Sequence, residues 1–408
     1  MAAMWSPIIG LLLLLLPLAP SSASYIKYPL EGNVYPTGHF LVTMNIGEPL
    51  QPYSLDIDTG SNVTWLECQH PHHRCHGSPG VKRFYKPGPA NLRVDCKDPF
   101  CTSLHADLPG RRPRCPRKHP HECHYEIGYV DMRTQGVLVN DTISLGGGRN
   151  ELIVFGCGYD QRLKNLPGPK PTPAPAAHGL LGLGMGKVGF VAQLKAHGVI
   201  TKDVIGHCLS SSSSRKGGGY LFIGDYDKLP STGMTWAPLK KYGLHYSPGQ
   251  ATLHLDGQQI YANGMNVVFD SGATYTYVPT QIYKPLVAKL KAIIGNTLDP
   301  VRHHALPNCW MRRGTVEPFD DVSRPSGILT LRFDNNIVMT LLPKNYLIRV
   351  ENNIACLGIL NGSDVGQNER IIIGDATMRD MLVVYDNEQG RIGWASGDCK
   401  YSATTSRL

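Results

Sequence analysis

The chain contains the same short pattern twice, and the repetition limits what it can fold into. One apolar stretch ends in Asp58-Thr59-Gly60-Ser61, and another ends in Asp270-Ser271-Gly272-Ala273. A single Asp-hydroxyl-Gly run after a strand is an ordinary turn signal. Two copies, one in each half of a chain of 408 residues, instead predict two similar halves, each of which places an aspartate at the end of a strand.

A second pattern follows each copy. Bulky apolar residues precede a glycine in Gly179-Leu180-Leu181-Gly182 and again in Ile371-Ile372-Ile373-Gly374. Tyr129 lies between the first pair of motifs, and Trp65 follows the first aspartate by seven residues. Together these motifs resemble those of pepsin-like aspartic proteases of plants. The sequence of residues 55–68 resembles that of the nucellin-like branch of the family.

The resemblance spans roughly residues 39–399 and implies a fold class. We expect an all-β, bilobal, pepsin-like fold with two β-barrel-like lobes and an active-site cleft between them. The 44 glycines and 31 prolines independently favour a turn-rich, mostly β architecture. We place the N-terminal lobe at residues 39–233 and the C-terminal lobe at residues 234–399, followed by a tail over residues 400–408.

Three segments should be recognisable within these lobes. Alternating apolar residues over 39–47 predict a first strand, and residues 219–224 predict the strand that closes the first lobe. Apolar residues at helical spacing predict a helix over residues 279–294.

The N-terminus has the features of an export signal. An uncharged apolar run, Ile8–Leu18, precedes Ser21 and Ala23, whose small side chains predict cleavage of residues 1–23. An uncleaved signal anchor is the alternative, because no Lys or Arg precedes the run. Residues 24–38 would then be a short leader with hardly any room for a long prosegment. We therefore expect activity without an acid-triggered cleavage step, and a secreted (cell-wall) or vacuolar location.

Asp58 and Asp270 are the candidate catalytic residues. Hydrolysis of a peptide bond by water needs a base for the water and an acid for the carbonyl oxygen at the same time. Two carboxyls that share one proton supply both, because two like charges a few ångströms apart do not ionise together. The resemblance thus implies an aspartic endopeptidase with an acidic pH optimum, no metal and no cofactor.

The resemblance also implies roles for the neighbours of the two aspartates. Gly60 and Gly272 have no side chains to keep the two loops apart. Thr59 and Ser271 would form hydrogen bonds across the interface between the lobes, and Ser61 would donate to the outer oxygen of the first aspartate.

Ala273 departs from the family pattern, because relatives usually place a hydroxyl residue there as a donor to the second aspartate. A missing charge-assisted hydrogen bond predicts that the lower apparent pKa of the pair is raised. The acid limb of the activity profile would then lie at higher pH.

A flap over the substrate is expected around Tyr129, whose hydroxyl would hydrogen-bond to Trp65. Residues 130–133 (Val-Asp-Met-Arg) replace the glycine-rich tip that usually follows this tyrosine. Asp56 and Asp58 should face the same side of their strand, because they are two residues apart. Asp56 would either favour a basic substrate side chain beside the scissile bond or be capped by loop amides, and the sequence leaves both alternatives open.

Eleven cysteines in an exported chain predict disulfides. The resemblance implies one pair, Cys309 with Cys356. The densest group runs from Cys68 to Cys123 and is interleaved with histidines, so that zinc binding is the alternative interpretation there.

The remaining features concern partners and modification. The net charge is +8, and the Arg-rich residues 111–118 are expected to form a solvated loop or to contact anionic wall polymers, because no nucleic-acid-binding motif accompanies them. We expect polypeptide substrates, no membrane span and a monomer.

Glycosylation sequons occur at Asn62, Asn140 and Asn361. We expect a glycan on Asn140 or Asn361, and none on Asn62, which is too close to Asp58.

Two other functions compete with proteolysis. A binding protein on the same scaffold, similar to the xylanase inhibitors, would have lost catalysis, and the presence of both aspartates disfavours it. A secreted glycosidase also uses two carboxyls, but the paired Asp-x-Gly motifs match no glycosidase pattern.

Overall fold

The structure is a computed structural model, and it describes residues 24–69, 75–78, 80–81, 83–88, 93–107, 119–164, 177–212, 217–226, 229, 233–304, 306–312 and 326–401. The expected signal (1–23), the Arg-rich run (111–118) and residues 402–408 of the tail lie outside the described residues. The α-helices in the described part are α1 (Pro99–Asp107), α2 (Phe190–Ala196), α3 (Thr280–Gly295) and α4 (Asp375–Met378).

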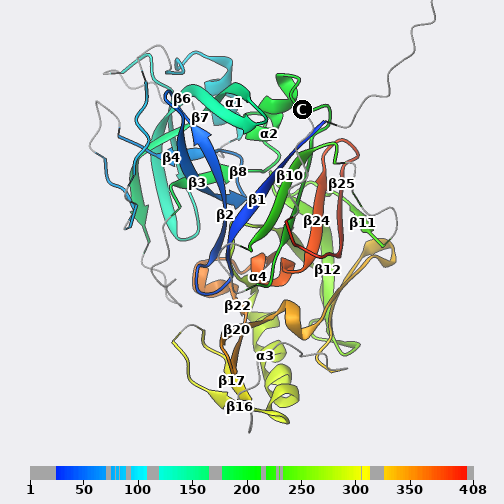
Figure 1. Ribbon diagram of the computed structural model, residues 1–408. Helices are drawn as coiled ribbons and strands as arrows, with labels where there is room; N and C mark the ends of the chain where they lie inside the picture. Colours follow the sequence, from blue (N-terminus) through cyan, green and yellow to red (C-terminus); the bar gives the residue numbers. More distant parts are fainter. Residues whose placement is uncertain are drawn as a thin grey trace, which may run out of the picture.

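One large sheet extends through both halves of the chain (Figure 1). Its 13 strands, in spatial order, are β11 (Thr235–Pro238), β25 (Arg391–Ser396), β24 (Met381–Asp386), β9 (Val204–Leu209), β10 (Gly219–Gly224), β1 (Tyr25–Asn33), β2 (His39–Ile46), β3 (Gln51–Asp58), β8 (Gly179–Gly182), β4 (Trp65–Glu67), β7 (Arg149–Leu163), β6 (Met132–Gly146) and β5 (His124–Gly128). The first three strands in this order come from the second half, and β24 pairs with β9 of the first half. The two halves are therefore joined through a shared sheet.

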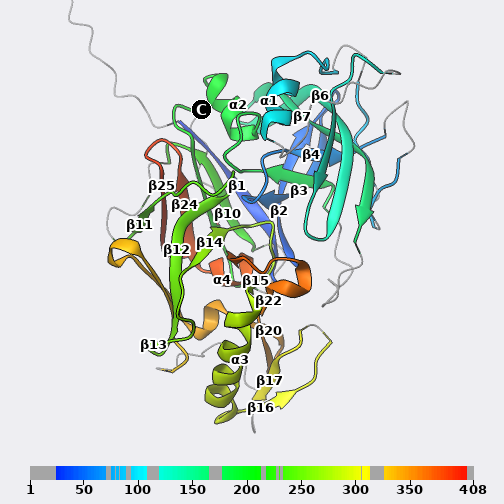
Figure 2. The same ribbon diagram turned by 180° about the vertical axis from the view of Figure 1, so that it is seen from behind.

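The second half builds two further sheets, seen from behind in Figure 2. The larger contains β19 (Val338–Leu341), β18 (Leu329–Phe333), β12 (Tyr246–Leu255), β14 (Met265–Phe269), β23 (Arg370–Ile373), β15 (Thr276–Val278) and β22 (Ile359–Asn361), with β13 (Gln258–Gln259) paired to β12. The smaller contains β16 (Leu298–Val301), β17 (Cys309–Arg312), β21 (Ile354–Leu357) and β20 (Leu347–Glu351). The prediction of an all-β, bilobal fold is confirmed.

The three segments predicted from periodicity are present. Strand β2 matches the predicted first strand, β10 matches the closing strand, and α3 begins one residue after the predicted start of the helix. The buried side of α3 carries Ile282, Leu286, Leu290 and Ile294, four residues apart, and this spacing keeps one stripe of the helix against the core.

Residues 24–38, which were expected to be a short leader, contain strand β1 and are part of the folded sheet. Ile26 and Leu30 are buried in the core, and the strand pairs with β10 and then with β2. Pro29 interrupts the sequence signal of a strand, yet it lies where only β10 is paired, and β2 joins from residue 31. Lys27 is only 7% exposed, and its ammonium lies 4.2 Å from the centroid of the Tyr220 ring.

Four disulfides lie among the described residues, Cys68–Cys157, Cys101–Cys123, Cys208–Cys399 and Cys309–Cys356. The last is the pair that the resemblance implied. Cys68, Cys101 and Cys123, which the zinc alternative would use as thiolates, are each bonded to another sulfur. These three cysteines therefore offer no thiolate to a metal ion.

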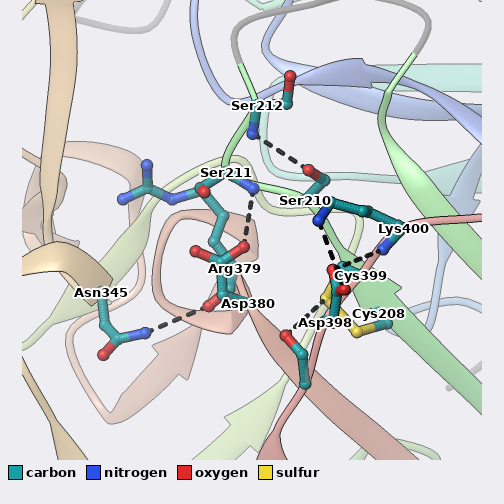
Figure 3. Close-up of a disulfide and its surroundings, with 11 residues drawn as sticks. Cys208, Ser210, Ser211, Ser212, Asn345, Arg379, Asp380, Asp398, Cys399 and Lys400 are labelled. Atoms are coloured by element: carbon teal, nitrogen blue, oxygen red, sulfur yellow. Dashed lines mark hydrogen bonds and ion pairs between the residues drawn. A yellow bond between two sulfur atoms is a disulfide. The ribbon is translucent and has the colours of Figure 1, made fainter. Parts of the chain in front are cut away.

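The Cys208–Cys399 disulfide joins the end of β9 to the segment after β25 (Figure 3). Hydrogen bonds tie the same place together, because the Asp380 N–H donates to the Leu209 carbonyl (2.8 Å) and the Ser211 N–H donates to the Asp380 carboxylate (3.0 Å). The disulfide thus links the first half of the chain to its C-terminal end across the shared sheet.

Removing this disulfide should cost more stability than removing Cys101–Cys123. The two bonds close loops of 191 and 22 residues, and loop-closure entropy predicts losses of about 5 and about 3 kcal/mol in the free energy of unfolding. Denaturant unfolding of the two Cys→Ser double variants measures the difference. An equal or smaller loss for the Cys208–Cys399 variant would show that the shared sheet already holds the two ends together without the bond.

Candidate active site

The two Asp-hydroxyl-Gly motifs occupy equivalent places in the fold. Strand β3 runs parallel to β8 and aligns Asp58 with Gly182, and β14 runs parallel to β23 and aligns Phe269 with Ile373. Each aspartate thus lies at the end of a strand whose parallel neighbour carries the apolar-Gly motif. The repeated sequence patterns therefore form one repeated structural unit.

Thr59 and Ser271 hold the two loops together by reciprocal hydrogen bonds. The N–H of Thr59 donates to the Ser271 hydroxyl (3.1 Å), and the N–H of Ser271 donates to the Thr59 hydroxyl (3.0 Å). The Ser271 hydroxyl donates onward to the Ile57 carbonyl (2.8 Å), and the Thr59 hydroxyl to the Phe269 carbonyl (3.3 Å). These four buried bonds bring the two aspartates together from opposite halves of the chain.

Gly60 and Gly272 leave space for the opposite carboxyl. A Cβ atom on Gly60 would lie 2.5 Å from an oxygen of Asp270, and one on Gly272 would lie 2.5 Å from an oxygen of Asp58. Such contacts are far inside van der Waals distance, so only glycine permits this approach at either position.

The two carboxyls receive different numbers of hydrogen bonds. Asp58 accepts from the Gly60 N–H (2.8 Å) and from the Ser61 hydroxyl (2.5 Å), whereas Asp270 accepts from the Gly272 N–H (3.0 Å). Burial raises the pKa of both carboxyls. The donors from Ser61 and Gly60 oppose this rise at Asp58, and the charge of Asp58 raises the pKa of Asp270 further. Asp58 therefore favours the charged form, and Asp270 favours the protonated form.

This asymmetry changes the expectation for Ala273. The first ionisation places the charge on Asp58, which keeps its Ser61 donor, so the missing hydroxyl at Ala273 affects the second ionisation, that of Asp270. We expect Ala273→Ser to stabilise ionised Asp270 and to move the alkaline limb of the kcat/KM profile down by about one pH unit. The acid limb should stay in place. A shift of the acid limb alone would contradict this assignment of the proton.

The expected flap is the hairpin of β5 and β6. The Trp65 indole N–H donates to the hydroxyl of Tyr129 (2.8 Å), the contact that the resemblance implied. Burial and then the charge of Asp58 raise the pKa of Tyr129, so its hydroxyl stays protonated. Lys164, which follows β7, donates its backbone N–H to the Asp131 carbonyl (2.7 Å) and its ammonium to the carbonyls of Tyr129 and Val130. The glycine-free flap tip is thus supported by a third segment of the chain.

Sequence reasoning missed three titratable residues near the dyad. Burial and then the charge of Asp56 raise the pKa of Asp375, the residue that follows the second apolar-Gly motif. The guanidinium of Arg370, at the start of the same motif, lowers the pKa of Asp270. The third is His245, whose ring contacts the backbone of Gly60. Their adjacency to the motifs could have drawn attention to Arg370 and Asp375, whereas nothing local indicates His245.

The three sequon asparagines lie in different surroundings. Asn62 packs against Gly184 and Gly186, since a Cβ on Gly184 would lie 2.2 Å from its side-chain oxygen. Asn140 is half-buried in β6. The side chain of Asn361 accepts a hydrogen bond from the Thr280 hydroxyl (2.7 Å). Glycans at Asn140 or Asn361 stay a prediction.

Known proteins resemble the chain over its whole length. Two domain-family models match, xylanase inhibitor N-terminal over residues 40–225 and xylanase inhibitor C-terminal over residues 248–396. An aspartic proteinase of rice (Oryza sativa subsp. japonica) is 42% identical over 431 residues, which cover 100% of both chains. The chain belongs to the plant aspartic proteinase family. Aspartic proteinase 36 of Arabidopsis thaliana is 27% identical to this family member, over 90% of this chain and 75% of the relative.

Solved structures share the fold of this chain. Basic 7S globulin from soybean has a TM-score of 0.66 at 15% identity and covers 94% of this chain and 98% of its own. Conglutin gamma from lupine seeds has a TM-score of 0.65 at 17% identity, and the match covers 92% of this chain and 95% of conglutin gamma. The fold is thus the bilobal pepsin-like one, and the narrower nucellin-like placement stays a prediction. Among the described residues, no helix is long and apolar enough to cross a membrane.

Proposed function

We propose that this family member is an aspartic endopeptidase that hydrolyses polypeptides at acidic pH with a water molecule activated between Asp58 and Asp270. The asymmetry of the pair carries the proposal. Asp58 has two short hydrogen-bond donors and favours the charged form, whereas Asp270 has one and favours the protonated form. A base and an acid are then present at the same moment, as hydrolysis requires.

The steps follow from this assignment. Asp58 removes a proton from the water as its oxygen attacks the carbonyl carbon, and Asp270 gives its proton to the carbonyl oxygen. The tetrahedral diol then breaks its C–N bond as the amide nitrogen takes the proton held by Asp58. One diol hydroxyl returns its proton to Asp270, which restores the starting state. Activity is lost in acid when Asp58 is protonated and at higher pH when Asp270 ionises.

A binding protein on the same scaffold is the second candidate, because both matching domain models are named for xylanase inhibitors. Such a protein needs neither aspartate. The retained donors of Asp58 and the glycines that admit both carboxyls favour proteolysis, since a binding role gives no reason to keep this close approach.

One assay separates the two candidates. The purified protein should cleave acid-denatured globin between about pH 3 and 5, and pepstatin, which occupies the dyad of aspartic proteases, should stop the cleavage. Absence of cleavage by a folded protein that inhibits a xylanase would favour the binding function.

We also propose that the protein acts in an oxidising compartment on the secretory pathway, either the cell wall or the vacuole. Four disulfides among the described residues support an exported protein. A carboxyl-terminal fluorescent fusion, followed in plant cells before and after plasmolysis, distinguishes wall from vacuole, and a cytosolic signal would contradict the proposal.

A further inference from the structure

Asp56 lies on the active-site side of β3. Its backbone is flanked by Leu41 of β2 and Leu180 of β8, and its side chain shares a strand face with Asp58. The residue is half-buried, and one carboxyl oxygen is buried without a hydrogen-bond partner. The backbone N–H of Phe40 is the one amide that lowers the pKa of this carboxyl. Asp56 is therefore not fully capped by loop amides, because one of its two carboxyl oxygens has no hydrogen-bond partner.

A second carboxyl faces Asp56 from the other half of the chain. Asp375 is the first residue of α4 and is only 1% exposed, and one of its carboxyl oxygens also lacks a hydrogen-bond partner. Asp56 is the charged group that most raises the pKa of Asp375. A buried polar oxygen without a partner is unfavourable, so the open oxygen of half-buried Asp56 would gain from a donor that a bound substrate supplies.

The charged groups around these carboxyls all have the same sign. Asp58 on the same strand, Asp131 on the flap and Asp270 after β14 each raise the pKa of Asp56. Asp56, Asp270 and Asp58 likewise raise the pKa of Asp375. Within the described ranges, no Lys, Arg or His forms an ion pair with any of these five aspartates. Asp56 thus has no basic side chain paired with it, although the chain has a net charge of +8.

We propose that Asp56, together with Asp131 from the flap, forms an acidic subsite that binds a Lys or Arg side chain of the substrate within two residues of the scissile bond, while Asp375 lies buried behind it. The proposal rests on the proposed function and names its substrate class. Two residues along a strand separate side chains by about 7 Å, so an amine at Asp56 belongs to a residue close to the bond under attack.

A bound metal ion fits these residues less well. A cation site needs three ligand atoms that converge on one point, and the convergent groups among the described residues are Cys101-His105-Cys123 and His303-Cys309-Cys356. Neither group includes Asp56 or Asp375. A long, flexible side chain with a single positive end reaches separate carboxyls without that convergence.

One positive charge, that of Arg370, also acts on the dyad. The Arg370 guanidinium lies 5.2 Å from the centroid of the Tyr242 ring and lowers the pKa of Asp270. His245 is half-buried, its ring contacts the backbone of Gly60, and burial and Arg370 lower its pKa. Neither residue is among the charges that act on Asp56. Lysine should therefore be favoured where its ammonium approaches Asp56 and disfavoured where it approaches Arg370.

The test is a set of otherwise identical peptides in which one lysine or one leucine is placed in turn at each of three positions on either side of a single cleavable bond. We expect a higher kcat/KM for lysine at one position on the Asp56 side, with a lysine-to-leucine ratio that rises with pH as Asp56 ionises. Asp56→Asn, an isosteric change, should lower that ratio at least about tenfold and remove its pH dependence. Asp131→Asn should lower it less, and exposed Asp334→Asn should leave it unchanged.

Binding of the same peptides with a reduced, uncleavable bond separates this inference from the proposed function. Cleavage of the leucine peptides with a lysine ratio that Asp56→Asn does not alter would overturn the subsite and leave the protease intact. Tighter binding of the lysine peptide that Asp56→Asn abolishes, without any cleavage, would support the subsite and contradict the protease. If neither peptide is cleaved or bound by the folded protein, both proposals are overturned.

Discussion

Replacing Asp58 or Asp270 with Asn should abolish peptide hydrolysis, with a fall in kcat of at least about a thousandfold in each variant. Asn cannot accept the proton of the water at position 58 and cannot supply a proton to the carbonyl at position 270. Both residues lie in the same reaction step, so the double variant should be no slower than either single variant. Initial rates on a peptide with a quenched fluorophore measure the effect.

The fold should survive these changes. The reciprocal bonds of Thr59 and Ser271 involve neither carboxyl, and Asn is isosteric with Asp. Ser61→Ala is the graded control, because it removes one donor from Asp58 and leaves both carboxyls in place. It should raise the acid limb of the profile without abolishing activity. Retention of more than a few percent activity in either Asn variant, at an unchanged melting temperature, would contradict the dyad.

Asp375→Asn should stabilise the protein at pH 8 and leave its stability nearly unchanged at pH 4. Burial raises the pKa of this carboxyl, and the charges of Asp56, Asp270 and Asp58 raise it further. A raised folded-state pKa favours folding below the unfolded pKa of about 4, and that stability is lost as the pH rises through the folded value. Each such proton contributes up to about 1.4 kcal/mol per pH unit. Asn mimics the neutral acid at every pH.

Thermal unfolding of wild type and variant across pH 4 to 8 tests this expectation. Burial lowers the pKa of His207 to about 3. Because the unfolded chain takes up this proton at about pH 6.5, His207 lowers the free energy of unfolding as the pH falls below that value. The difference between the two proteins cancels that contribution, because both contain His207. Asp334→Asn, at an exposed position, should give no such pH-dependent difference. Parallel curves for wild type and Asp375→Asn would mean that Asp375 is ionised in the folded protein.

The sequence could predict the dyad because its parts are contiguous. Each tetrapeptide carries the carboxyl, the hydroxyl that crosses to the other lobe and the glycine that admits the opposite carboxyl. The fold class followed from the duplicated pattern, and the helix over Thr280–Gly295 followed from its periodicity.

Other features depend on contacts between distant segments. Asp56 and Asp375 meet only because the two halves fold against each other, and no local pattern indicates it. Strand β1 was missed because Lys27 and Pro29 interrupt its apolar alternation, and both are accommodated by β10. Cys157 lies far from the cysteine-rich segment in the sequence, yet it pairs with Cys68. The proton distribution within the dyad depended on counting donors, which the sequence suggests only for Ser61.

A single turnover in ¹⁸O-labelled water tests the central claim most directly. Excess enzyme is mixed with peptide substrate at about pH 4, and the products and the enzyme are analysed by mass spectrometry. Direct attack by a water held between Asp58 and Asp270 predicts one ¹⁸O atom in the new carboxyl group of the product and none in either aspartate. Label in Asp58 or Asp270 with an unlabelled product would show a covalent acyl-enzyme. Absence of product from folded enzyme would contradict hydrolysis altogether.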